Sequence, residues 1–154
     1  MGTNNTIKTD YSYIFGKDNI VEGKYGVAIG YGNQVSGMVS VALGSWCKTY
    51  RSYGVAIGKG CESDSMSTAI GFHAAALDNK CFAFGHFVKS SAKRSMTLGT
   101  GVTNSTYLEN SIENSLMIGF SSDVPTFFIS SSNGSGTTGK IGIGNITGSF
   151  NQCF

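Results

Sequence analysis

The sequence predicts an all-β protein: a parallel β-roll solenoid with coils of 14 residues, ended by a C-terminal β-hairpin cap. Three observations predict this fold. A short phrase ending in glycine recurs along the chain, its residues alternate between bulky and small, and glycine is abundant, at 22 of 154 residues, beside a single proline. A 14-residue period is too short for a pair of helices, and Val, Ile, Phe and Tyr favour strands.

The phrase is clearest as Gly-Val-Ala-Ile-Gly at 26–30, and its final glycine marks each repeat. Counted from Gly2, the spacing is 14 residues up to Gly99, with one step of 13, and then 20. Fourteen residues at ~3.3 Å each make a closed path of roughly 46 Å, enough for two strands and two tight turns. Each repeat is therefore one coil of a solenoid, stacked on the next. The repeat glycines are Gly16, Gly30, Gly44, Gly58, Gly71, Gly85, Gly99 and Gly119.

The first strand of each coil alternates with period two, as side chains on a strand must. The positions one and three before the glycine are bulky and lie on the same side of the strand. We expect these two columns to form the core of the roll. The predicted core residues are Val27, Ile29, Val41, Leu43, Val55, Ile57, Ile70, Phe82, Phe84 and Leu98.

The opposite side of this strand carries almost only small residues. A face in contact with water would normally carry charged or long polar side chains. Small residues permit close approach of another backbone, so we expect another copy of the chain to pack here; a small-residue face left open to water is the alternative. The predicted trimer-packing face consists of Ala28, Ala42, Ala56, Ala69 and Ala83.

The second strand of each coil has small, apolar and amide columns that should point inward, and charged columns that should point outward. Asn5, Asn19 and Asn33 share one inward column. Their side chains should form an amide ladder that satisfies buried polar groups along the roll.

The end of the chain predicts a different element. Thr126–Ser130 and Lys140–Gly144 are expected strands joined by a Gly/Ser loop, and as a hairpin or as a sheet between chains they would cover the last open edge of the solenoid. We therefore divide the chain into a roll at 1–119 and a cap or connector at 120–154. The lengthened step at Thr103–Ser115 is either a lateral loop or a plain connector.

Composition and motifs exclude several functions. A net charge of +2 without a basic stripe predicts no nucleic-acid partner, and no apolar stretch of about 18 residues predicts no membrane insertion. We expect no catalytic, cofactor or metal site. His73 and His86 occupy different columns without acidic partners. Cys47 and Cys61 share a column in adjacent coils, so they are either small buried residues or a disulfide pair.

The remaining candidates for chemistry are weak. Acidic residues are scattered outward and form no groove of carboxylates, which argues against an enzyme such as a glycan depolymerase on a β-solenoid. Cys81 and Cys153 show no motif spacing, and the threonines form no regular ice-binding ladder. Aromatic residues near the turns could stack on a glycan or serve as packing or trimer contacts. They are Trp46, Tyr50, Tyr53 and Phe72.

The repeated phrases Gly-Val-Ala-Ile-Gly and Ser-Val-Ala-Leu-Gly, best at 26–30, 40–44, 54–58 and 67–71, resemble the YadA-type head repeats of trimeric autotransporter adhesins. The resemblance covers residues 2 to about 119. It implies a left-handed roll, three chains side by side, and adhesion to host matrix or receptors.

The C-terminal part, from Ser115 through Asn145, is similar to segments of phage tail fibres. The start at Met1–Asn5 has no features of a signal peptide, which favours a virion component. The sequence thus predicts a non-enzymatic, trimeric segment of a phage tail or virion fibre that attaches to a host receptor or glycan. The alternative is the head of a bacterial adhesin at the cell surface, and a glycan depolymerase is the remote one.

Overall fold

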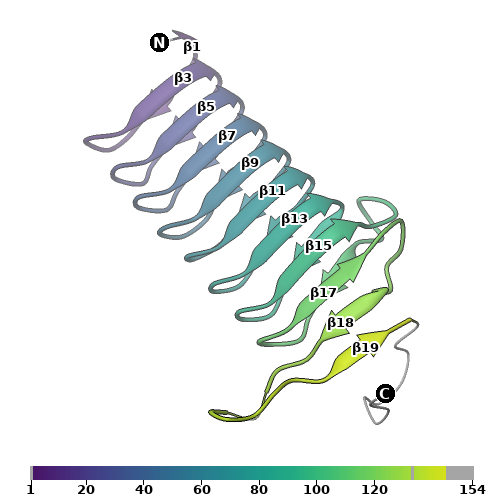
Figure 1. Cartoon of the computed structure of the whole chain (residues 1–154). Helices are drawn as coiled ribbons and strands as arrows, with labels where there is room; N and C mark the ends of the chain where they lie inside the picture. Colours follow the sequence, from purple (N-terminus) through teal and green to yellow (C-terminus); the bar gives the residue numbers. More distant parts are fainter. Residues whose placement is uncertain (1, 133, 145–154) are drawn as a thin grey trace.

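The computed structural model is a β-roll of two parallel sheets that face each other across a narrow interior, and it describes residues 2–132 and 134–144. Between Tyr13 and Thr100, each coil contributes one strand of five residues to the larger sheet, and the strands of the smaller sheet have two or three residues (Figure 1). The predicted all-β solenoid with coils of about 14 residues is confirmed.

The larger sheet, here sheet A, has eleven strands among the described residues and runs the length of the roll. Its first nine strands are parallel and the last two are antiparallel. In spatial order they are β1 (Gly2–Thr3), β3 (Tyr13–Lys17), β5 (Val27–Tyr31), β7 (Val41–Ser45), β9 (Val55–Lys59), β11 (Thr68–Phe72), β13 (Phe82–His86), β15 (Met96–Thr100), β17 (Leu116–Gly119), β18 (Phe127–Ile129) and β19 (Ile141–Ile143).

The smaller sheet, sheet B, forms the other wall. It is parallel throughout, and each strand pairs with the equivalent strand one coil away. Its strands are β2 (Thr6–Ile7), β4 (Ile20–Val21), β6 (Gln34–Val35), β8 (Lys48–Thr49), β10 (Glu62–Ser63), β12 (Ala75–Ala76), β14 (Val88–Ser90) and β16 (Leu108–Asn110).

The repeat glycine fixes the register of sheet A, because glycine pairs with glycine in successive coils. Gly30 pairs with Gly44, and Gly44 with Gly58. Gly44 has φ 119°, and a Cβ added there would lie 1.9 Å from the carbonyl oxygen of Gly58. Only glycine is compatible with this backbone angle and this close approach.

The interior of the roll is lined by the alanine column, which contradicts the predicted trimer-packing face. Ala28, Ala42, Ala56, Ala69 and Ala83 are all completely buried inside the roll and belong to its main hydrophobic cluster. They face the inward side chains of sheet B, such as Val21 and Val35. The residues are small because the two walls lie close together and leave little room between them.

The predicted core is therefore wrong, because its two columns point away from the interior. Ile29, Phe82 and Phe84 are more than 40 % exposed, and the others are only partly buried. Bulky and small residues do alternate along each strand of sheet A, as predicted. The small residues, however, face the interior and the bulky ones face outward. The residues that lie outside rather than in the core are Val27, Ile29, Val41, Leu43, Val55, Ile57, Ile70, Phe82, Phe84 and Leu98.

The amide ladder is confirmed. The Asn5 side chain donates to the carbonyl of Gly16 at 2.7 Å, and its Oδ1 accepts from the backbone N–H of Asn19 at 3.0 Å. Asn33 continues the same pattern one coil further on. Cys47 then takes the place of the asparagine, with its thiol directed at the Gly58 carbonyl at 3.3 Å. These bonds satisfy the polar backbone groups at one corner of the roll.

The predicted cap is also confirmed, as an antiparallel pair of strands that extends sheet A beyond the end of sheet B. Met117 pairs with Phe128, and both side chains lie on the inner side of the sheet. Phe128 is 1 % exposed and packs with Leu108 in the core cluster. The inward column thus changes from alanine to large side chains where the opposite wall stops. Residues 145–154, including Cys153, lie outside the described residues.

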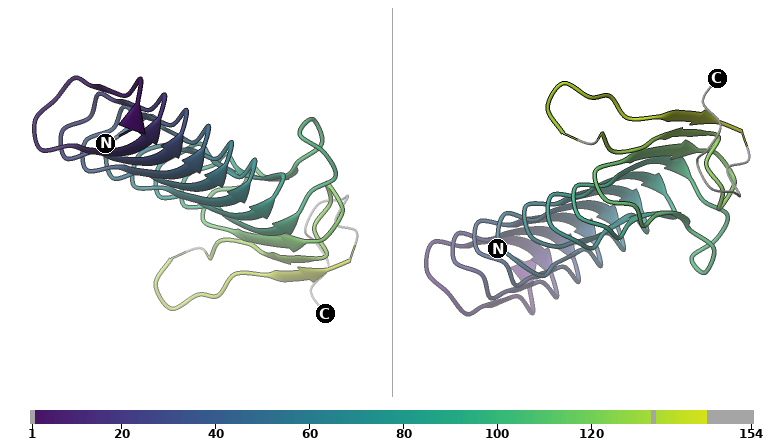
Figure 2. Two further views of the ribbon diagram at one scale, coloured as in Figure 1. Left: turned by 90° about the horizontal axis from the view of Figure 1, so that it is seen from above. Right: turned by 90° about the horizontal axis from the view of Figure 1, so that it is seen from below.

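The lengthened coil forms a lateral loop next to β15 and β16. Thr103 and Thr106 form an isolated antiparallel bridge at its tip. Figure 2 shows this loop beside the end of the roll, away from the stacked coils. Because the loop leaves the coil and returns to it, β15 and β17 still pair in register.

Candidate interaction surface

The outward side of sheet A is a continuous surface of bulky apolar side chains, here called the outer apolar face. It combines the positions three and one before each repeat glycine. Phe15 is 61 % exposed and Tyr13 is 72 % exposed. The face consists of Tyr13, Phe15, Val27, Ile29, Val41, Leu43, Val55, Ile57, Thr68, Ile70, Phe82, Phe84, Met96, Leu98, Leu116 and Ile118, and of Phe127, Ile129, Ile141 and Ile143 in the cap.

The cap continues this face although the chain reverses direction there. Leu116 pairs with Ile129, and Ile129 pairs with Ile141, so one outward column runs through all three strands. Ile143 is 79 % exposed at the end of the neighbouring column. An apolar surface preserved through a change in strand direction points to a function of the face itself. At ~4.8 Å per strand and ~16 Å per five-residue strand, its area is on the order of 800 Å².

The outward side of sheet B is polar and is held by ion pairs between neighbouring coils. Lys8 lies 2.7 Å from Glu22, Lys48 lies 3.7 Å from Glu62, and Lys89 lies 3.0 Å from Glu109. Hydrogen bonding to the Lys8 ammonium holds the pKa of the Glu22 carboxyl below its usual value of 4.5. The roll is thus amphipathic, with one wall suited to water and the other suited to a partner.

Two rows of turns flank the outer apolar face. The first row follows the strands of sheet A and is here called the exit ridge; it contains the residues one and two after each repeat glycine. Trp46 packs edge-on against Tyr31, with ring centroids 4.9 Å apart, and lies over Gly32, which leaves room for the indole. Phe72 contacts three further rings and the ammonium group of Lys59 at 5.4 Å. Its aromatic and lysine side chains, which the name exit ridge refers to from here on, are Lys17, Tyr31, Trp46, Lys59, Phe72, His73, His86 and Phe87.

The second row precedes the strands of sheet A and is here called the entry ridge; it contains the residue five before each repeat glycine. Every one of these residues has a left-handed backbone conformation, including the β-branched Val39 at φ 54°. Tyr11 and Tyr25 stack with centroids 5.4 Å apart. Large residues in this conformation are costly and cluster at functional positions. The ridge comprises Tyr11, Tyr25, Val39, Tyr53, Met66, Lys80, Arg94 and Asn114.

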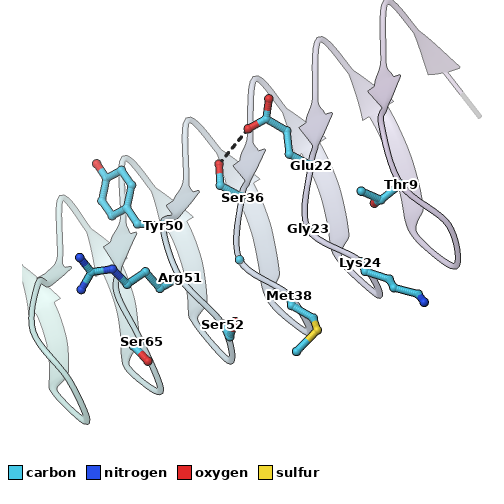
Figure 3. A pocket seen from close by; sticks show the side chains of 11 residues that line it. Thr9, Glu22, Gly23, Lys24, Ser36, Met38, Tyr50, Arg51, Ser52 and Ser65 are labelled. Carbon is cyan, nitrogen blue, oxygen red and sulfur yellow. Dashed lines mark hydrogen bonds between the residues drawn. The ribbon is translucent and has the colours of Figure 1, made fainter.

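A shallow groove of about 590 Å³ crosses several coils between sheet B and the turns that precede sheet A (Figure 3). Its floor is low because Gly23 and Gly37 have no side chains. Glu22 accepts a hydrogen bond from Ser36 along one wall. Tyr50 stands beside them, and burial together with the nearby carboxylates of Glu62 and Asp64 raises its pKa to about 12, so the phenol stays neutral.

The residues considered for chemistry do not assemble into a reactive centre. Within the described part of the chain, no group of three His, Cys, Asp or Glu side chains could hold a metal ion. His73 and His86 each pack against Phe72 instead. Cys47 and Cys61 are free and completely buried. A hydrogen bond between these thiols, together with burial, raises the pKa of Cys61, and that bond lowers the pKa of Cys47 to about 7.

Cys81 is likewise a free, buried thiol, as expected for a substitute of the small residues in its column. Its sulfur occupies a position equivalent to the serine hydroxyls of neighbouring coils and lies 2.9 Å from the carbonyl of Ala92.

Over residues 2–132 and 134–144, the structure contains no helix that could span a membrane.

With this geometry established, the comparison with known families adds one finding. Residues 22–45 match two copies of the YadA head domain repeat. No curated protein and no solved structure matches the chain. The matched head repeats span β5 and β7, where Val27, Ile29, Val41 and Leu43 form part of the outer apolar face. The comparisons give no support to the resemblance between the C-terminal part and phage tail fibres.

Sequence reasoning missed the outer apolar face because it assigned every bulky column to the core. One signal could have revealed it. Along the strand, the positions four before, two before and at the glycine all lie on one side, and in the repeats they are almost always Ser, Gly or Ala. Three small columns therefore lie side by side on one face of the strand, and the second strand of each coil is short. This combination indicates a narrow interior with no space for bulky side chains.

Proposed function

We propose that this chain is a structural and binding segment of a trimeric adhesin head at a bacterial cell surface. The observation that carries the proposal is the outer apolar face, which is bulky, exposed and continuous along sheet A, whereas the opposite wall is polar. A monomer would expose far more contiguous apolar surface than soluble proteins usually do. The match to the YadA head repeat supports the adhesin over a phage fibre.

The width of the outer apolar face fits an assembly of three copies. If three sheets with a width of ~16 Å enclose a triangular prism, each lies about 5 Å from the axis, which is half the ~10 Å spacing of packed sheets. One layer of Ile, Val, Leu and Phe side chains fills that distance. Four copies would leave each sheet about 8 Å from the axis, with a channel in the middle. The area of roughly 800 Å² per copy also reaches the range of stable interfaces.

The trimer model replaces the alanine face with the outer apolar face as the contact between chains. It leaves sheet B and the groove at Gly23 and Gly37 facing outward. These are the surfaces on which a host receptor or glycan would bind. The function is attachment without catalysis, and the left-handed coil implied by the resemblance stays a prediction.

Light scattering after size exclusion tests the assembly. We expect a mass of three times the 16.2 kDa chain. A folded monomer would overturn the trimeric adhesin proposal. Attachment is tested by the binding of labelled protein to an array of host matrix proteins and glycans. We expect Arg51→Glu, on the groove wall, to reduce the retained signal while the trimer persists. A chain that binds nothing on the array as a trimer would contradict the attachment role.

A further inference from the structure

The two ridges that flank the outer apolar face lie at opposite ends of the strands of sheet A, and their side chains are complementary to each other. In a closed ring of copies, the entry ridge of one copy meets the exit ridge of the next. We propose that these ridges pack together coil by coil into a continuous seam between neighbouring copies. This inference rests on the proposed trimer and goes beyond it by naming a second contact surface, with its residues and its register.

The backbone of the entry ridge is strained at exposed positions. Tyr25, Val39, Tyr53 and Met66 hold left-handed conformations, with φ between 52° and 62°. Their side chains are nevertheless between 43 % and 53 % exposed. Glycine or asparagine would fit such turns at lower cost. A row of large apolar residues that are both strained and exposed indicates contacts which the isolated chain does not provide.

The exit ridge presents aromatic rings that are only partly covered within the chain. Trp46 is 52 % exposed although it packs on Tyr31 and over Gly32. His86 and Phe87 form a further ring contact at 4.2 Å. These rings are ordered against each other within one chain and still present apolar surface outward. Both ridges are thus preformed, which reduces the entropy lost on association.

The residue types on the two ridges favour pairing between equivalent coils of neighbouring copies. The exit ridge contains two lysines, and in both coils the entry residue is a tyrosine: Tyr11 faces Lys17, and Tyr53 faces Lys59. Ammonium groups bind favourably over aromatic rings. A shift of one coil in one direction would instead place Lys59 against Val39, and in the other direction against Met66. Pairing within the same coil places a tyrosine beside Lys17, and adds Tyr53 to the Phe72 ring that the Lys59 ammonium already contacts at 5.4 Å in its own chain.

The remaining coils fit the same register. Val39 faces Trp46, and Met66 faces Phe72, which are apolar pairs of the kind that dominate stable interfaces. The basic entry residue Lys80 faces the ring of Phe87 and no lysine. None of the pairs named here joins two lysines or arginines.

Site-specific cross-linking tests the seam in the full chain. The variant Val39→Cys/Trp46→Cys is made in a Cys153→Ser background, in which Cys47, Cys61 and Cys81 are buried. A bismaleimide shorter than the rise of three coils, about 14 Å, joins neighbouring copies. We expect covalent dimers and trimers on a denaturing gel. The matched control is Val39→Cys/Phe87→Cys, whose second site lies three coils away and which should remain largely uncross-linked.

Light scattering on the same samples before cross-linking separates the two proposals. A trimer that forms no covalent product with Val39→Cys/Trp46→Cys overturns the seam and leaves the trimer intact. A folded monomer overturns the proposed function, and the seam with it. If circular dichroism shows that this variant does not fold, Tyr53→Cys/Lys59→Cys tests the next coil in the same way. Equal cross-linking of the control and the test variant would also refute the register.

Discussion

Two neighbouring residues on β9 should respond in opposite ways to the same substitution. Ala56 is completely buried inside the roll, and Ile57 points outward in the middle of the outer apolar face. We expect Ala56→Asp to prevent folding, because it places a carboxylate without a partner in the narrow interior. Such a buried charge costs several kcal/mol, comparable with the whole stability of a small domain, about 5–15 kcal/mol.

Ile57→Asp should leave a folded monomer instead. Ile57 is already partly buried in the single chain, so trimer formation removes only the rest of its surface from water, which contributes roughly 0.5–1 kcal/mol per copy, or roughly 1.5–3 kcal/mol per trimer. At ~1.4 kcal/mol for each factor of ten, loss of this contact weakens association roughly ten- to a hundredfold. Three carboxylates brought together near the axis would weaken it further.

The assay combines light scattering for mass with circular dichroism for folding, and Thr6→Asp on the outward side of sheet B is the matched control. The control should stay folded and trimeric. The opposite result, a folded Ala56→Asp and an unfolded Ile57→Asp, would refute the assignment of inside and outside. A trimeric Ile57→Asp would refute the outer apolar face as the contact.

Three further outcomes follow from the described structure. Gly44→Ala should lower the melting temperature far more than Gly134→Ala, because both glycines have positive φ but only an added Cβ at Gly44 would collide with backbone; equal effects would contradict the close approach. Thr49→Val should raise the free energy of unfolding by about 1–2 kcal/mol, because the Thr49 hydroxyl is buried without a partner and Val35 fills the same column one coil away; a loss measured in urea would show that the hydroxyl has a partner. Glu22→Gln should flatten the loss of stability in acid: the pKa of the carboxyl is lowered in the folded chain, so its contribution is present above about pH 4.5 and disappears as pH falls through the folded pKa, and melting curves from pH 6 to 3 that coincide in slope would contradict this.

Four features could be predicted from the amino-acid sequence: the coil length, the glycine register, the amide ladder at Asn5, Asn19 and Asn33, and the hairpin cap. Each of these depends on local periodicity or on residues that only one backbone geometry accepts. The burial of Cys47 and Cys61 as small side chains was also predictable, since both occupy a column of small inward residues.

The side of the strand that faces the interior is known only from the packing of the two sheets. Period-two alternation is the same whichever face points inward, so the columns of Ala56 and Ile57 could be exchanged without any change in the pattern. The choice depends on the distance between sheets A and B, and that distance is set by both walls and the turns together. Because the gap admits only small side chains, the bulky columns lie outside, where they form a surface for partners rather than a core.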